Sequence, residues 1–320
     1  MTISGFMIVK DVVCQGYPFL EAIVSALPVC DEFLISDGFS TDHTWDALQL
    51  LKTKYPGKIK LFQDKWVGKT NCGEVLADMT NKLKSRCSGD YCLNIQANEV
   101  LHEESVEELR KLPIFFPGVE IFSLPFYNLL GETLLWTVDF RRRLFKNRDF
   151  ITSQGDAFDV YYDKRRLLLN PLKYLNYRLM GAGQKTYYLP KPFFRYRSLF
   201  PKNYLLKLRK KMEIVQNLDA ANRLNKEAAY AEKLINSLKG HGVKTFWNGM
   251  QHYFDEVVYH GTTPSLHHQI PRFCIKELEE MPKIIAHLHC KWEYELRESL
   301  DALQLRAHEA TDQTKINYNN

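Results

Sequence analysis

The sequence predicts an α/β fold, in which a mostly parallel sheet carries helices on both faces and a helical extension follows at the C-terminus. Within residues 1–100, four short apolar runs alternate with amphipathic segments long enough to form one helix each. Such alternation favours parallel strands joined by helical crossovers. Each apolar run also ends in a carboxylate or in several polar side chains. Beyond Pro201 the composition changes to a proline-free stretch rich in Lys, Leu, Asn, Glu and Ala.

The apolar runs and the helical periodicity locate the individual elements. Continuous apolar runs of four to seven residues are typical of strands buried on both faces, and they predict strands over 3–9, 33–36, 59–63 and 91–95. A spacing of three and four residues between apolar positions predicts helices over 17–27, 44–54 and 72–86. A further strand is expected over 119–124. The aromatic, glycine-broken stretch that follows, 125–136, is expected to be a loop.

The C-terminal third of the chain is predicted to be mainly helical. The spacing of apolar residues predicts one long amphipathic helix over 202–239, then helices over 243–259 and 275–305 and a frayed tail. The chain is therefore divided into a sheet domain over 1–200, a helical extension over 201–310 and a flexible tail over 311–320. The apolar face of the long helix would pack on the sheet domain or on a partner subunit, which would make the protein a homo-oligomer.

Composition narrows the class of protein. The 320-residue chain is 45% hydrophobic and 25% charged, as is usual for a globular protein. Its net charge of +5 suits an anionic ligand but is too small to indicate nucleic acid. Seven scattered cysteines without a CxxC pair indicate reduced thiols, and no signal peptide is recognisable, so a cytoplasmic protein is expected. Proline, glycine and glutamate interrupt the most apolar region, 114–136, so no transmembrane segment is expected.

Polar side chains follow the four predicted parallel strands where each strand ends. They are Asp11, Asp37, Asp64 and the Asn98-Glu99 pair. Because parallel strands end along one edge of a sheet, these groups are expected to line a common ligand site. Carboxylates there suit ribose hydroxyls, base N–H groups or a metal ion. The alternative is that each one caps a helix or faces solvent.

Residues 37–44, Asp-Gly-Phe-Ser-Thr-Asp-His-Thr, resemble the D-G-x-S-T-D-x-T signature of the family 2 glycosyltransferases, which have the GT-A (Rossmann-like) fold. The order of strands and polar strand ends is also similar to that family over roughly residues 3–200. The resemblance implies a glycosyltransferase domain over 1–200 that uses a nucleotide-sugar donor such as a UDP- or GDP-sugar. It also implies the residues that bind the nucleotide: Lys10, Asp11, Asp37 and Asp64.

The chain departs from this family at the metal motif. Where the family carries D-x-D-E, this sequence has Gln96-Ala97-Asn98-Glu99. The resemblance assigns Asn98 and Glu99 to Mg²⁺ or Mn²⁺ and Gln96 and Asn98 to the donor, but a neutral amide is a weaker ligand for a hard dication than a carboxylate. The degenerate motif therefore leaves metal dependence open.

A downstream arginine offers a replacement for the metal. Residues 190–197 resemble a family segment, P-x-x-H-Y, whose histidine approaches the metal, and Arg195 stands at the histidine position. A guanidinium can neutralise a diphosphate bidentately without a metal. We therefore predict a metal-independent transferase in which Arg195 binds the diphosphate. The alternative is that Arg195 is a surface residue of a basic loop.

The middle of the chain is expected to supply the acceptor side. Resemblance to a W…R-x-x-R-L-F-R run of the family suggests that Trp136 and Arg143 contact an acceptor, which would be a glycan, a lipid-linked molecule or a protein. An inverting transfer needs a carboxylate that takes the proton of the acceptor hydroxyl. Asp156, which follows a glycine in a turn, is the first candidate for this catalytic base, followed by Asp159 and then Asp139.

The function predicted from the sequence is therefore inverting glycosyl transfer. A non-catalytic relative that binds a nucleotide or glycan, or that scaffolds through its helices, is the alternative that the altered metal motif suggests. A sugar-phosphate nucleotidyltransferase would share the sheet. That chemistry requires a glycine-rich basic loop after the first strand, and residues 10–16 contain one glycine.

Overall fold

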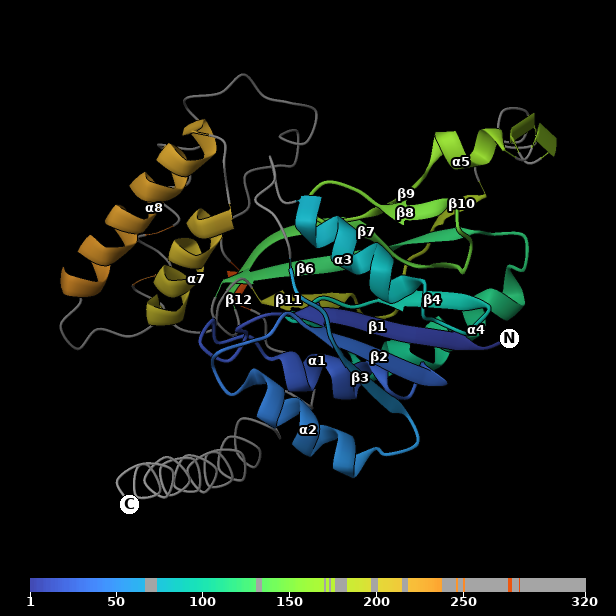
Figure 1. The fold of residues 1–320 in the computed structure, drawn as a ribbon, viewed down its shortest axis with the longest axis horizontal. Helices are drawn as coiled ribbons and strands as arrows, with labels where there is room; N and C mark the ends of the chain where they lie inside the picture. The colour runs from blue at the N-terminus through green and yellow to red at the C-terminus, as the bar shows by residue number, and fades with distance from the viewer. Residues whose placement is uncertain are drawn as a thin grey trace, which may run out of the picture.

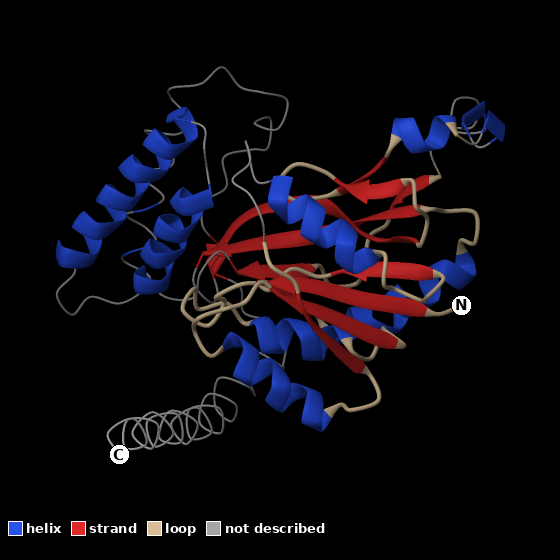
Figure 2. Ribbon diagram, viewed as in Figure 1, coloured by secondary structure: helices blue, strands red, loops and turns tan. Residues whose placement is uncertain are grey.

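The computed structural model has a mixed α/β architecture built around one twisted sheet (Figures 1 and 2). It describes residues 1–66, 74–130, 134–169, 171–172, 174–175, 183–196, 201–214, 218–237, 246, 250, 276–277 and 282. Within these residues the large sheet has ten strands, eight of them in the order β3-β2-β1-β4-β7-β6-β11-β5. The predicted fold class, a sheet with a parallel half and helices against both of its faces, is confirmed and is consistent with the GT-A type of fold.

The N-terminal half follows the predicted alternation closely. Its elements are β1 (Ile3–Val9), α1 (Phe19–Ala26), β2 (Glu32–Asp37), α2 (Thr44–Lys54), β3 (Ile59–Gln63), α3 (Glu74–Lys84) and β4 (Tyr91–Asn94). The four strands pair in parallel. Figure 1 shows α1 and α2 on one face of the sheet and α3 on the other. The expected edge, where the carboxyl ends of the strands meet, is therefore present.

The second half adds antiparallel pairing. Its elements are β5 (Glu99–Leu101), the short 3-10 helix η2 (Glu103–Ser105), α4 (Val106–Phe115), β6 (Ile121–Leu130), β7 (Leu134–Lys146), β8 (Ile151–Ser153), β9 (Val160–Tyr162), α5 (Lys164–Leu168), β10 (Gln184–Thr186) and β11 (Phe193–Tyr196). Strand β7 runs antiparallel to both β4 and β6, and so closes the gap between the parallel half and the rest of the sheet.

The prediction of a loop over 125–136 was wrong, because β6 and β7 form a long antiparallel ladder through most of it. Pro125 lies inside β6 opposite Phe140, and the neighbouring Leu124 and Phe126 are fully buried. Burial of these side chains and cross-strand pairing outweigh the local preference of proline against a strand. The glycine and glutamate that suggested a loop, at 131–132, fall between the two strands.

The predicted long helix over 202–239 is observed as α7 (Pro201–Ile214) and α8 (Leu218–Ser237). The two helices pack through Tyr204, Leu208, Ala228 and Ala231. Residues 276–277 form a short strand, β12, against β7, so the helix predicted from residue 275 does not begin there. Most of the remaining predicted helix over 243–259, and the tail, lie outside the described residues. The domain boundaries at 200 and 310 stay predictions.

Gly5 fixes the packing of the sheet at its centre. A Cβ atom at this position would lie 2.3 Å from Cδ2 of Phe33 and 2.6 Å from Sγ of Cys30. Both contacts are far shorter than van der Waals distance, so β1 can approach β2 and its flanking turn only because residue 5 lacks a side chain. Over the described helices, none has the length and apolar character needed to cross a bilayer.

Glu32 ties together the opposite edge of the sheet, away from the candidate site. Its carboxylate accepts hydrogen bonds from Ser4 Oγ (2.6 Å), Ser88 N (2.8 Å) and Lys60 Nζ (2.6 Å). Burial alone would raise the pKa of Glu32, but these donors lower it from 4.5 to about 2. The ionised carboxylate therefore stabilises the fold at neutral pH.

This arrangement predicts an acid-sensitive contribution to stability. Because the folded-state pKa is lowered, the contribution is complete above about pH 4.5 and is lost as the pH falls towards 2. In Glu32→Gln the free energy of unfolding at pH 7 should fall by about 2 kcal/mol. The free energy of unfolding of this variant should also decrease less steeply between pH 4.5 and 2 than that of the wild type. Urea unfolding at a series of pH values measures both effects. Glu104→Gln, at an exposed position, is the control, and an equal change in both variants would contradict the assignment.

Candidate functional site

Two loops at the carboxyl edge of the sheet are fastened to each other by the signature residues 37–44. The Asp11 carboxylate accepts hydrogen bonds from Thr41 N (2.7 Å) and Thr41 Oγ1 (3.1 Å), and the backbone N–H of Asp11 donates to Ser40 Oγ (2.7 Å). Further bonds join Cys14 N to Asp42 Oδ2 (2.7 Å) and Val12 N to Thr44 Oγ1 (3.0 Å). The short polar side chains of the signature thus hold the loop after β1 against the loop after β2.

Asp37 is enclosed by its own loop. It is fully buried and accepts from Ser40 N (3.1 Å) and from Gln63 Nε2 (3.2 Å), besides a short bond from the Ser40 hydroxyl. Asp37 therefore shapes the signature loop directly. A nucleotide that contacted this carboxylate would have to displace one of these donors.

Trp66 and Lys10 lie beside these loops and leave a hydrogen-bond donor that a ligand could satisfy. A Cβ atom on Gly38 would lie 2.7 Å from Nε1 of Trp66, so the signature glycine permits the indole to lie directly against the loop. Lys10 Nζ lies 5.7 Å from the centre of the Trp66 ring. The indole Nε1 is buried and has no hydrogen-bond partner. An orphaned buried donor is unusual in a native protein and is satisfied readily by a bound ligand.

Asp64 lies apart from Asp37. Since adjacent residues of a strand face opposite sides, Asp37 and Gln63 share one face, whereas Ser36 and Asp64 share the other, below α3. Arg86 holds Asp64 bidentately (2.6 and 2.9 Å), and Lys82 Nζ (2.7 Å) and Ser36 Oγ (2.7 Å) complete its contacts. The hydrogen bonds from Arg86, more than those from Lys82 and Ser36, hold the pKa of Asp64 well below its usual range. The predicted role of Asp64 in donor binding would require these bonds to break.

A second cluster gathers charged and aromatic side chains from the start of β5, from β7, from β11 and from residues 154–159. We call it the arginine cluster; its members are Glu99, Arg141, Phe158, Arg143 and Arg195. Glu99 and Arg143 are both fully buried and pair bidentately, with distances of 2.9 Å from Nε to Oε2 and 2.6 Å from Nη2 to Oε1. Arg143 Nη1 also donates to the carbonyl oxygen of Phe158 (2.7 Å). Burial by itself would lower the pKa of Arg143, but the Glu99 carboxylate raises it above its usual value.

Arg195 is held much more loosely. Its nearest polar contacts are Gln96 Oε1 (3.4 Å), Asn128 Oδ1 (3.5 Å) and Glu99 Oε1 (3.7 Å), and its Nε is buried without a hydrogen-bond partner. The guanidinium lies 4.5 Å from the centre of the Phe158 ring and is 23% exposed. Burial, with Arg143 and Arg141 adding to it, lowers the pKa of Arg195 despite the opposing charge of Glu99. Such a guanidinium would gain a close partner if an anion bound.

The predicted metal ligands do not fit a dication. Arg143 and the backbone N–H of Gln96 (3.1 Å) occupy both oxygens of Glu99, and Asn98 donates its amide to the carbonyl oxygen of Tyr196 (2.7 Å). Hard dications prefer ionised carboxylates that are free to coordinate. Across the described part of the chain, no three His, Cys, Asp or Glu side chains converge on a possible metal position. The side chains at positions 98 and 99 are therefore a poor donor set for a dication, and the assignment of Asn98 and Glu99 to a metal stays a prediction.

The three candidate bases have different surroundings. Asp156 is exposed on a turn in which Gly155 (φ 61°) and Ala157 (φ 58°) take left-handed conformations. Asp159 accepts from Arg142 N (2.7 Å) and lies 3.6 Å from Arg141 Nη1. Asp139 pairs with Arg141 through one oxygen, while its Oδ1 is buried without a partner. The carbonyl of Ala157 accepts from Gln96 Nε2 (3.3 Å), which joins this turn to the cluster.

The structure describes the side chain of only one of the two predicted acceptor residues, Trp136 and Arg143. Trp136 lies within β7, but its side chain is outside the described residues. Arg143 has no exposed surface, because it is enclosed by Glu99 and Phe158, so its prediction as an acceptor contact is not supported by its position. Its observed surroundings give it a supporting role beneath Arg195.

Three residues that the sequence did not single out belong to these sites, Trp66, Asn128 and Phe158, together with Arg141 of the basic run 141–143. The Arg141 guanidinium also lies over the Phe158 ring, 3.7 Å from its centre. The pairing of β6 with β7 shifts register between Phe122 and Ser123, so that Arg143 has no partner of its own in the ladder. A β-bulge of this kind redirects side chains locally. The sequence offered one signal, the charged run 139–143, but no residue pattern revealed the bulge.

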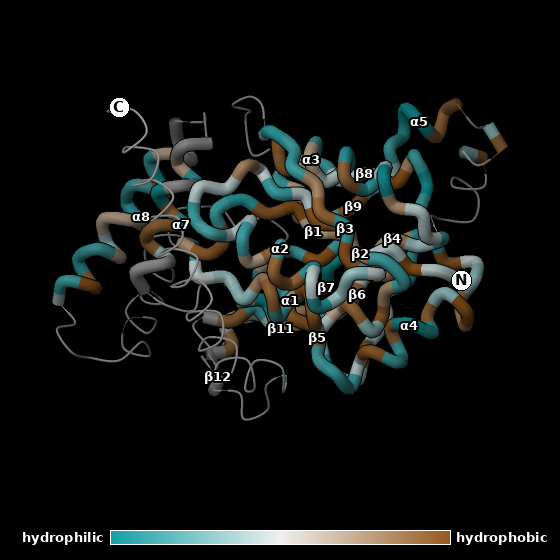
Figure 3. The backbone as a smooth tube through the Cα atoms, turned by 60° about the horizontal axis from the view of Figure 1, so that its bottom comes forward, coloured by the Kyte–Doolittle hydropathy of each residue, from teal (hydrophilic) through white to brown (hydrophobic). Residues whose placement is uncertain are grey.

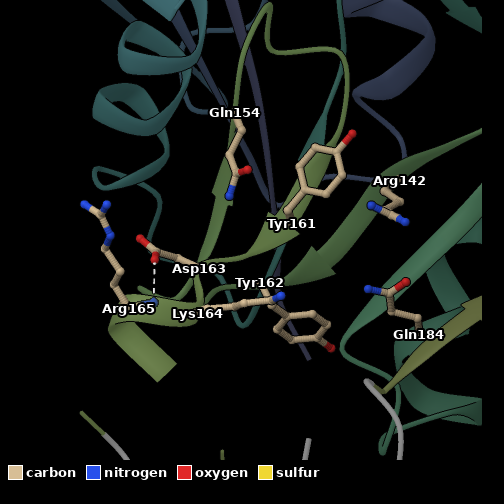
Figure 4. A pocket seen from close by; sticks show the side chains of 8 residues that line it. All are labelled: Arg142, Gln154, Tyr161, Tyr162, Asp163, Lys164, Arg165 and Gln184. Carbon is tan, nitrogen blue, oxygen red and sulfur yellow. Dashed lines mark hydrogen bonds between the residues drawn. The ribbon is translucent and has the colours of Figure 1, made fainter. Parts of the chain in front are cut away.

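A separate open hollow of about 460 Å³ lies between β9, α5 and β10 (Figure 4). Its lining is basic and aromatic: Arg142, Gln154, Tyr161, Tyr162, Asp163, Lys164, Arg165 and Gln184. Arg142, which lies 4.8 Å from the centre of the Tyr161 ring, faces this hollow, whereas its neighbours Arg141 and Arg143 face the arginine cluster.

No family model and no curated protein matches the chain. Among solved structures, S. aureus TarS 1-349 in complex with UDP is 13% identical, with 72% of this chain and 70% of that chain covered and a TM-score of 0.35. The mannosyltransferase PcManGT from Pyrobaculum calidifontis, in complex with GDP-Man and Mn²⁺, is 13% identical over 82% and 76%, with a TM-score of 0.38. Glucosyl-3-phosphoglycerate synthase from Mycobacterium tuberculosis is 15% identical over 58% and 68%, with a TM-score of 0.36. Since TM-scores of this size do not establish a common fold, any function must be argued from the sites themselves.

The buried ion pair predicts an asymmetry between neighbouring arginines. Arg143→Met should lower the free energy of unfolding by about 3 to 5 kcal/mol, because it leaves the Glu99 carboxylate buried without a partner. Arg142 lies on the same strand but makes no such buried ion pair with the described residues. Arg142→Met should therefore lower the free energy of unfolding by about 1 kcal/mol or less. Adding Glu99→Gln to Arg143→Met should recover part of the loss. Denaturant unfolding measures all four proteins, and equal losses in the two single arginine variants would contradict the account.

Proposed function

We propose that the protein is an inverting glycosyltransferase of the family 2 type, which moves a sugar from a UDP- or GDP-sugar to an acceptor hydroxyl without a metal ion. The observation that carries this proposal is Arg195, a partly exposed guanidinium whose polar contacts are all 3.4 Å or longer. It occupies the position at which the family resemblance expects a metal-approaching histidine. The carboxylate that would have held the metal, Glu99, is already neutralised by Arg143.

The nucleotide is proposed to bind at the two fastened loops. Each of these loops contains a non-glycine residue in the left-handed conformation, Asp11 (φ 50°) after β1 and Phe39 (φ 56°) after β2. Non-glycine residues in this conformation cost energy and are concentrated at functional sites. The orphaned indole N–H of Trp66 and the ammonium of Lys10 supply donors suited to a nucleotide, and Gln96 and Asn98 extend the same edge towards the arginine cluster.

The chemistry would then proceed as a single displacement. The acceptor oxygen attacks the anomeric carbon, the bond from that carbon to the β-phosphate oxygen breaks, and negative charge collects on the departing diphosphate. Arg195 would stabilise that charge by charge-assisted hydrogen bonds. Its loose packing in the free protein leaves its donors available, and Arg143, Arg141 and Phe158 restrict its position so that little reorganisation is needed.

Asp156 is proposed as the base that accepts the acceptor proton. It makes no hydrogen bond or ion pair among the contacts that the structure describes, whereas Arg141 and Arg142 engage both Asp139 and Asp159. An ion pair with arginine weakens a carboxylate as a base, since it favours the charged form. The acceptor class, a glycan, a lipid-linked molecule or a protein, follows from no contact that the structure describes.

A non-catalytic relative that binds a nucleotide or glycan is the second candidate. It is favoured by the absence of a carboxylate at positions 96 and 98, which removes the usual metal ligands. Hydrolysis or transfer from any donor would exclude it. A homo-oligomer through α7 and α8 is compatible with both functions.

The role of Arg195 predicts metal-independent turnover. With a panel of UDP- and GDP-sugars, donor hydrolysis or transfer should persist in excess chelator and should fall about 100- to 1,000-fold in Arg195→Ala. Arg195→Lys should recover only part, because an ammonium cannot bind bidentately. Arg142→Ala serves as the matched control with near-normal turnover. Strict dependence on Mn²⁺ in the wild-type protein would contradict the mechanism.

The choice of base predicts a distinct pattern among three aspartates. Asp156→Asn should abolish transfer while the Kd for the nucleotide, from calorimetry, stays within about twofold, since the base contacts the acceptor and not the donor. Asp159→Asn and Asp139→Asn should act mainly through Arg141 and Arg142 and so lower the melting temperature as well. Full transfer activity in Asp156→Asn would rule out this residue and would direct attention to Asp159 and then to Asp139.

A further inference from the structure

Residues 164–175 expose an unusual amount of apolar surface. We call this segment the α5 arm; it begins with α5 (Lys164–Leu168) and includes the described residues up to Leu175. Its leucines are 57% (Leu168), 85% (Leu169), 81% (Leu172) and 54% (Leu175) exposed. Scattered exposed leucines are normal in globular proteins, but four leucines that are each more than half exposed within eight residues indicate an interaction site.

The arm is also strongly basic. Between residues 164 and 175 the sequence carries four basic residues and no acidic one: Lys164, Arg165, Arg166 and Lys173. The side chains of Lys164 and Arg165 are exposed. Arg166 is 55% exposed although it lies 3.4 Å from Asp163, which caps the helix through Arg165 N (3.0 Å). Leucines and cations in one short segment without acids are typical of segments that lie on an anionic membrane surface.

The arm lies at the periphery but is anchored to the sheet domain. Leu167 is 2% exposed and packs in the same cluster as Phe150, Val160 and Tyr162, so the base of the arm is fixed while its leucines face outward. Figure 1 shows α5 beyond β8 and β9, at the opposite side of the molecule from α7 and α8. In Figure 3 the backbone changes from hydrophilic to hydrophobic along this segment.

Charge decides between the possible occupants of this surface. A symmetric contact with a second copy would place two such basic segments against each other, and like charges brought together cost energy. An anionic lipid surface is instead complementary to both components, because the leucines enter the interface and the cations meet the headgroups. The hollow of Figure 4, lined in part by Lys164, Arg165 and Arg142, opens beside the same arm and adds to its positive field.

We propose that the α5 arm binds the interfacial region of an anionic lipid bilayer. The inference rests on exposure and charge alone and does not depend on glycosyl transfer. It places the protein on a membrane surface, with the basic hollow turned towards the headgroups.

The experiment is vesicle co-sedimentation of the full chain. The wild-type protein should bind vesicles of phosphatidylcholine with about 30% phosphatidylglycerol, bind pure phosphatidylcholine about tenfold more weakly, and lose most binding in about 0.5 M NaCl. Leu169→Glu with Leu172→Glu, and separately Lys164→Glu with Arg165→Glu, should each weaken binding at least about tenfold. Both pairs change exposed positions, so their circular dichroism and melting temperature should match those of the wild type.

Leu206→Glu, at a leucine that is 41% exposed on α7, is the matched control and should bind vesicles as the wild type does. Three results would overturn the proposal. They are no binding by the wild type, equal binding by the α5 arm variants, and a concentration-dependent dimer that Leu172→Glu abolishes while vesicle binding is absent. Donor hydrolysis by the same variants tests the proposed function separately, because neither pair touches the arginine cluster.

Discussion

The buried pair between Glu99 and Arg143 is the interaction on which the proposed diphosphate site depends. It joins β5 to β7, and through the carbonyl of Phe158 it also fixes residues 154–159. Removing two charges from water is costly, and only good geometry with further hydrogen bonds offsets that cost. Both conditions are met here, since the pair is bidentate and Gln96 N adds a third bond to the carboxylate. The result is a fixed platform beneath Arg195.

Different interactions stabilise the two parts of the carboxyl edge of the sheet. Around β1 and β2, short polar side chains bond to backbone groups a few residues away or in the adjacent loop, which makes a compact structure with little free charge. Around β7 and β11, guanidinium groups and aromatic rings make longer contacts and leave Nε of Arg141, Nε of Arg195 and Oδ1 of Asp139 buried without hydrogen-bond partners. Unsatisfied groups are costly unless a ligand completes them. The second region is therefore the one more altered by binding.

Much of the fold could be predicted because its signals are local. Continuous apolar runs identified β1 to β4, and helical periodicity identified α1 to α3, since strands buried on both faces and one-sided helices each leave a distinct pattern. The pairing of β6 with β7 was not predicted, because Pro125 and Gly131 suggested a loop. Pairing with strands far along the chain outweighs these local preferences, and the sequence does not show that pairing. The division of the predicted helix 202–239 into α7 and α8 was not predicted, because the periodicity of apolar residues continues loosely from one to the other.

The sequence by itself determined which polar residues stand at strand ends and that Arg195 replaces an expected histidine, because both follow from order along one chain. Only the tertiary structure decided which of those side chains remain available. Asp64 is taken by Arg86, 22 residues away, and Glu99 by Arg143, 44 residues away. The physical reason is that the state of a charged group depends on its nearest opposite charge, and the helix or strand that supplies it reaches the site only when the sheet closes.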